Sequence, residues 1–154
     1  MARNQAIVIG INQYNPNNLT PLNYAKRDAE LVRDFFEREA GFEKVYFFSD
    51  DAADIKVQLA RGRIISSPSQ PTLGNLRSFL QDYFETPRLT AGDNFWFFFA
   101  GHGLRYTDRD YLMPCDANPR DVEHTAIPVS YVTERLRRCG ADNVILLLDA
   151  CRDQ

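Results

Sequence analysis

The sequence predicts an α/β fold in which helices cover both faces of a mostly parallel central sheet. Apolar runs of strand length alternate along the chain with segments of helical period, as in folds built from β-α-β units. Two of these runs, Asp93–Ala100 and Asn143–Asp149, lack polar alternation, which is typical of parallel strands buried on both faces. The 154 residues show no internal repeat or linker, so one domain over 1–154 is expected.

The first third of the chain predicts a strand, a helix and a second strand. Gln5–Ile11 is apolar and rich in β-branched residues, and the Asn/Pro-rich segment Asn12–Asn18 is a loop. Thr20-Pro21 has the pattern of an N-cap followed by a first helical residue. Apolar side chains then repeat at helical spacing until Gly41, at Leu22, Ala25, Ala29, Val32 and Phe36. Lys44–Ser49 follows as the second strand.

Between residues 50 and 138, some segments carry a clear secondary-structure signal and others a weak one. Within Asp50–Pro71 we expect a weak helix over 53–62, followed by a loop. Thr72 caps a further helix, whose apolar face is Leu73, Leu76, Leu80 and Tyr83. Tyr106–Met113 is compatible with a hairpin, and Ser130–Arg138 is expected to form a short helix.

Composition excludes several classes of protein. The formal charge of −3 argues against a protein built mainly to bind nucleic acid. No apolar stretch is long enough to cross a membrane, and the first residues do not form a signal peptide. Three cysteines are an odd number and not a disulfide framework, which favours a reducing, cytoplasmic setting.

Two chemically competent side chains follow the two fully apolar strands. Gly101-His102-Gly103 comes after the first, and Cys151 after the second. If these strands are parallel neighbours, His102 and Cys151 meet at one edge of the sheet, where a thiolate nucleophile and an imidazole acid–base can act together. Taken alone, each residue is more often structural; the pairing makes catalysis the better interpretation.

These residues carry a family resemblance. The segments 97–103 (FFFAGHG) and 147–152 (LLDACR) resemble the caspase and metacaspase superfamily of cysteine peptidases, and the chain is most similar to the large catalytic subunit of prokaryotic orthocaspases. The segments AIVIGINQY, AKRDAELVRDFF and YLMPCD add weaker similarity along nearly the whole chain. The resemblance implies a three-layer caspase-like fold and a His102/Cys151 dyad, with Gly103 supplying an oxyanion N–H.

The resemblance also implies a preference for basic residues on the amino side of the cut. Asp149 stands where caspases that cut after Asp have Gln, and Asp28 matches a helix carboxylate that lines the metacaspase pocket. Two carboxylates would attract Arg or Lys and repel Asp. A solvated helix carboxylate is the competing interpretation of Asp28.

The sequence departs from the family pattern at positions that bear on the substrate pocket and on calcium binding. Ala100 replaces a pocket serine that many metacaspases have, and only Asp116 matches a position of their calcium site. A calcium ion binds six to eight oxygens, so we expect no required cofactor and only a weak case for calcium. We expect Cys115 and Cys139 to be structural thiols and His124 to lie on the surface.

Two functions other than peptide hydrolysis are compatible with an α/β domain: signalling without catalysis, and nucleotide binding. A catalytically silent caspase-like domain could act in signalling, although the intact dyad argues against it. A nucleotide-binding domain is disfavoured, because the loop after the first strand lacks a glycine-rich phosphate cradle.

From the resemblance, we expect the family's small subunit to lie outside this chain, in the downstream part of the same precursor. The last strand is therefore expected to expose an apolar edge. Self-cleavage by an Arg-specific enzyme near Arg61 and Arg63 is a further hypothesis. The terminal Gln154 does not fit such a cut.

Overall fold

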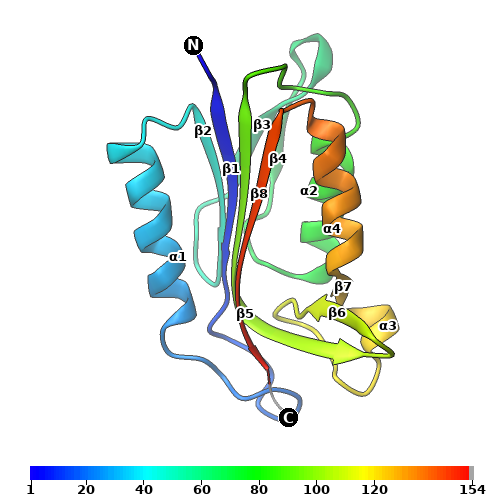
Figure 1. The fold of residues 1–154 in the computed structure, drawn as a ribbon. Coiled ribbons are helices and arrows are strands. Elements are labelled where there is room, and N and C mark those ends of the chain that lie inside the picture. Colours follow the sequence, from blue (N-terminus) through cyan, green and yellow to red (C-terminus); the bar gives the residue numbers. More distant parts are fainter. Residues whose placement is uncertain (153–154) are drawn as a thin grey trace.

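The computed structural model describes residues 1–152, except for the side chains of Ala60, Cys151 and Arg152. Its centre is a run of four parallel strands in the order β2-β1-β5-β8. These are β1 (Asn4–Gly10), β2 (Lys44–Ser49), β5 (Asn94–Tyr106) and β8 (Asn143–Arg152). The parallel sheet was predicted, and it brings the two fully apolar strands side by side (Figure 1).

An antiparallel extension continues the sheet from the far end of β5. There β5 pairs with β6 (Arg109–Leu112), which pairs with β7 (Ile127–Pro128). Thr107 and Asp108 form the turn between β5 and β6, and both have positive φ, at 48° and 62°. Two such residues are the mark of a tight hairpin turn, which confirms the predicted hairpin.

Helices cover both faces of the sheet. One face is covered by α1 (Ala25–Asp34), and the other by α2 (Leu73–Tyr83) and α4 (Val129–Leu136), as Figure 1 shows. A short helix, α3 (Val122–Thr125), lies beside β6 and β7. The predicted class, a mostly parallel α/β fold with helices on both faces of the sheet, is thus confirmed. None of the helices within residues 1–152 combines the length and the apolar character needed to cross a membrane.

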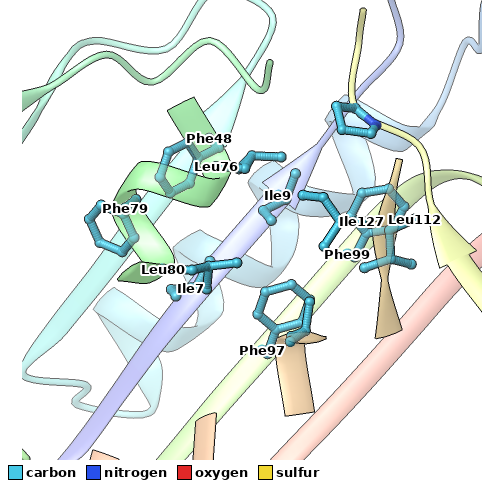
Figure 2. Close-up of a pocket in the computed structure, with 12 residues that line it drawn as sticks. Ile7, Ile9, Phe48, Leu76, Phe79, Leu80, Phe97, Phe99, Leu112 and Ile127 are labelled. Carbon is cyan, nitrogen blue, oxygen red and sulfur yellow. The ribbon is translucent and has the colours of Figure 1, made fainter. Parts of the chain in front are cut away.

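The alternation of side chains along β1 and β5 divides the core in two. Ala6, Val8, Phe98 and Ala100 pack with Ala25 and Ala29 of α1 and with Phe36 of the helical turn that follows it. The intervening residues face α2 and α4 and enclose an apolar cavity of about 10 Å³. Figure 2 shows this cavity lined by Ile7 and Ile9 of β1, Phe97 and Phe99 of β5 and Leu76, Phe79 and Leu80 of α2. Its lining residues are all apolar and none can act as a nucleophile, acid or base, so the cavity is part of the hydrophobic core.

The predicted weak helix over 53–62 is wrong. Ile55–Gln58 and Ile64–Ser67 instead form a two-stranded antiparallel hairpin, β3 and β4. Ile55 and Val57 are buried while Lys56 and Gln58 are exposed, so the burial follows a period of two. Arg61 and Arg63 lie exposed at the turn of this hairpin.

The predicted start of the first helix is also wrong. Its N-cap is Tyr24 and not Thr20. The side-chain oxygen of Asn12 accepts the Lys26 backbone N–H at 3.0 Å, so a loop residue satisfies the helix terminus from a distance. After Asp34, the helix continues as a π-helical turn over Phe35–Glu39. The second helix begins as predicted, with the Thr72 hydroxyl accepting the N–H of Asn75 at 3.1 Å.

Candidate active site

The two predicted catalytic residues lie opposite each other on neighbouring strands. In the register of β5 and β8, His102 pairs with Cys151 and Ala100 with Asp149. Both strands run further than predicted, so these positions are inside the ladder and not in loops after it. The Cys151 side chain lies outside the described residues. The register places its backbone directly across from His102.

A backbone carbonyl fixes the imidazole of His102. The His102 side chain is almost fully buried, with 1% of the residue exposed, and its Nε2 lies 2.6 Å from the carbonyl oxygen of Thr20. A carbonyl oxygen only accepts hydrogen bonds, so this contact assigns the ring proton to Nε2. In the neutral ring, Nδ1 then carries the basic lone pair.

Gly103 allows β5 and β8 to approach closely. A Cβ at this position would lie 2.8 Å from the Cβ of Ala150, which is closer than two such atoms come in proteins. Gly103 pairs with Arg152 on one side and with Leu112 on the other. The glycine therefore lies next to the His102–Cys151 pair and is needed there for packing.

Asp28 and Asp149 lie on the side of the sheet that α1 covers. Ala100 packs against this helix, and its register partner Asp149 shares its face because directly paired residues project to the same side. Asp28 follows Ala25 by one helical turn and is half-buried, whereas Asp149 is exposed. Lys26 of the same helix forms an ion pair with Asp51 at 2.7 Å, and this hydrogen-bonded contact raises the lysine pKa.

The other titratable candidates have structural surroundings. Burial, with the nearby carboxylates of Asp116 and Asp50, raises the pKa of the Cys115 thiol to about 11. Burial also raises the pKa of Cys139. His124 is exposed, as predicted, and its hydrogen bond to Asp121 at 2.8 Å raises the imidazole pKa.

The one position that matches a calcium ligand has another partner. The carboxylate of Asp116 accepts the backbone N–H of Leu73 at 2.9 Å and so supports the start of α2. Among the described side chains, His, Cys, Asp and Glu do not gather in threes around a metal position.

Sequence reasoning missed two residues that contact His102. The sequence predicts Thr20 as a helix cap and Tyr14 as a loop residue. In the structure, Thr20 supplies the carbonyl at Nε2, and the ring of Tyr14 lies edge-on to the imidazole, with 4.8 Å between the ring centroids. Both belong to the segment after β1. The sequence offers one indication of these contacts. A long polar loop follows β1, and β1 pairs with the strand that carries His102.

Comparison with known proteins agrees with this architecture. A search of curated proteins finds no match. Among solved structures, a protein from Geobacter sulfurreducens is similar in fold, with a TM-score of 0.64 at 18% identity. The similarity covers 97% of this chain and 50% of that protein, so the chain spans about half the length of the solved structure.

The family assignment comes from sequence. The peptidase family model described as the caspase domain matches residues 3–154, which include both strands of the site and the loop that holds His102. The chain therefore belongs to the caspase-domain family of cysteine peptidases.

Proposed function

We propose that the protein is a cysteine endopeptidase that hydrolyses peptide bonds after Arg or Lys through a His102/Cys151 dyad. The observation that carries this proposal is the register of β5 and β8, which sets Cys151 across from an imidazole whose proton is assigned to Nε2. Within the family, we assign the chain to the orthocaspase-like members and expect it in the cytoplasm.

In this mechanism, Nδ1 of His102 accepts the thiol proton of Cys151, and the thiolate attacks the scissile carbonyl carbon. The carbon–sulfur bond forms as the carbonyl electron pair moves to oxygen, where the Gly103 N–H stabilises the charge. His102 then protonates the leaving amine as the peptide bond breaks. A water molecule, deprotonated by His102, attacks the thioester and releases the acid and the free thiol.

Charge supports the choice of basic substrates. Asp149 is the register partner of Ala100, and Asp28 belongs to the helix that packs against Ala100. A guanidinium or ammonium group that reached both carboxylates would be doubly compensated. An aspartate side chain in the same place would be repelled by both carboxylates.

We further propose that the small subunit comes from the downstream part of the same precursor and adds to β8. In the described sheet, β8 pairs with β5 alone, and its residues Leu147 and Leu148 are each 42% exposed. No cofactor is required in this scheme.

The dyad is tested with the full-length protein and fluorogenic peptides that end in Arg, Lys or Asp. We expect cleavage of the basic peptides, loss of activity to background in Cys151→Ala, and normal activity in the control Cys115→Ala. If the unsubstituted protein cleaves none of the peptides, the silent signalling domain becomes the better account.

The substrate pocket is tested by Asp149→Asn and Asp28→Asn. Each change removes a charge-assisted contact to the basic side chain and should lower kcat/KM for the Arg peptide about 10- to 100-fold. Asp34→Asn is the matched control, because Asp34 ends the same helix at the distant end of the strands. Equal activity of all three variants would remove the pocket assignment while leaving the dyad in place.

A further inference from the structure

Beyond the carbonyl at Nε2, the backbone of His102 is held by a side chain. The hydroxyl of Tyr14 accepts the His102 backbone N–H at 2.9 Å and donates to the carbonyl oxygen of Met113 at 3.0 Å. Met113 in turn donates its N–H to the His102 carbonyl at 2.9 Å. The hydroxyl thus closes a ring of hydrogen bonds between the histidine and the residue after β6.

This hydroxyl occupies a gap in the sheet. The register of β1 with β5 ends at Ala100, whose carbonyl accepts the Ile11 N–H, and the register with β6 begins at Gly103. On this side of β5, His102 therefore lies between the end of the pairing with β1 and the start of the pairing with β6. Tyr14, only 6% exposed, supplies there the hydrogen bond that a strand would supply elsewhere.

Gly101 gives independent support for this contact. A Cβ on Gly101 would lie 2.7 Å from the Tyr14 hydroxyl oxygen and 2.9 Å from the Phe99 ring. The glycine before the histidine is thus required by the close approach of Tyr14.

Tyr14 and Thr20 act on His102 from one loop. The tyrosine holds the backbone and packs its ring edge-on against the imidazole, while the threonine carbonyl meets Nε2. Any movement of the backbone at His102 changes the direction of the imidazole relative to both Thr20 and the opposite strand.

We propose that Tyr14 is a positioning residue that fixes the backbone of His102 in the gap between β1 and β6 and so directs its imidazole. This inference rests on the proposed function for its consequence in catalysis. Its structural content, the orientation of His102, can be measured without activity.

The test is Tyr14→Phe, which keeps the ring and removes the hydroxyl. We expect kcat for the Arg peptide to fall about 10- to 100-fold with KM within about twofold, because misplacement of the acid–base group affects the chemical step. The matched control is Tyr83→Phe. Tyr83 is buried and its hydroxyl donates to the Gln5 side chain, at the opposite end of the strands from His102. This control should lower the melting temperature and leave kcat unchanged.

NMR of the imidazole nitrogens reports the tautomer of His102 directly. A loss of stability alone would not change these signals. His102 and His124 signals are assigned with His102→Gln and His124→Gln. In the unsubstituted protein, His102 should show the Nε2–H tautomer. In Tyr14→Phe, its signals should move toward tautomer averaging, while those of exposed His124 stay in place.

Gly101→Ala tests the same contact from the other side. Its Cβ displaces the hydroxyl, so it should lower kcat in the unsubstituted protein and have a smaller effect in the Tyr14→Phe background.

Unchanged His102 signals in Tyr14→Phe, or a fall in kcat that Tyr83→Phe reproduces, would overturn the proposal. So would fully additive effects of Tyr14→Phe and Gly101→Ala. If the unsubstituted protein cleaves no peptide, the proposed function fails, and the His102 signals still decide the role of Tyr14.

Discussion

The imidazole of His102 takes its direction from a backbone atom, the carbonyl of Thr20. Every residue type has such a carbonyl, so no sequence pattern could reveal this partner. The sequence could place His102 and Cys151 near each other, because two fully apolar runs predict adjacent buried strands. It could not show what holds the histidine, since that depends on the path of the loop after β1.

At the same scale, the three cysteines are predicted to react at different rates. Only the thiolate is alkylated, and burial together with nearby carboxylates raises the pKa of Cys115 to about 11. Burial also raises the pKa of Cys139. We expect iodoacetamide at neutral pH to modify Cys151 at least about tenfold faster than either, as measured by mass spectrometry of peptides from a time course.

Cys115→Ala serves as the control and should leave the fast modification intact. Modification of Cys115 as fast as that of Cys151 would contradict the assignment of the nucleophile.

Among the elements, the helix α1 depends on a glycine in β1. A Cβ at Gly10 would lie 2.5 Å from the Cβ of Ala29 and 2.9 Å from the carbonyl oxygen of Ala25. Gly10→Ala should therefore lower the free energy of unfolding by about 1–3 kcal/mol, as measured by urea denaturation. Gly74→Ala is the matched control: it lies in α2 with open space around it and should be neutral or stabilising. A stable Gly10→Ala protein would show that α1 does not pack as described.

The turn before β5 is predicted to make stability sensitive to acid. The carboxylate of Asp93 accepts the backbone N–H groups of Arg3 and Thr90, each at 2.8 Å, and these bonds lower its pKa. A carboxyl whose pKa is lower when folded stabilises the protein above its unfolded pKa and loses that contribution as the pH falls through the folded value.

Denaturant midpoints measured between neutral pH and the acid range should therefore fall less steeply in Asp93→Asn than in the unsubstituted protein. Parallel curves for the two proteins would argue against this contribution.

The errors in predicting elements have a common physical origin. The segment 53–62 has helix-compatible spacing, but Ile55 and Val57 are buried and Lys56 and Gln58 exposed, so pairing with β4 determines the structure. Thr20-Pro21 has the local pattern of a helix start, yet Asn12 satisfies the helix terminus through a tertiary contact. In both places, contacts between distant segments override a local preference.

At the scale of the molecule, the order of layers follows from sequence more directly than the ends of elements do. The unbroken apolar character of β5 predicts burial on both faces, which requires helices on both sides of the sheet, and this strand is buried from Phe97 to Gly103. The same prediction is wrong for β8, whose residues 143–150 are half-buried or exposed, because in the described chain β8 pairs with β5 alone. The exposed Leu147 and Leu148 agree with the expected apolar edge at β8. The pairing of a thiol with an imidazole is predicted from the two strand ends that carry Cys151 and His102. The charge of the substrate follows only from the family resemblance, because burial and periodicity do not encode it.

The central claim is that a His102/Cys151 dyad cleaves after basic residues. It is tested most directly by a positional-scanning peptide library incubated with the full-length protein, with calcium and with a chelator, and with Cys151→Ala in parallel. We predict cleavage after Arg and Lys under both conditions and no cleavage by the variant. Cleavage after Asp, or equal cleavage by Cys151→Ala, would contradict the account.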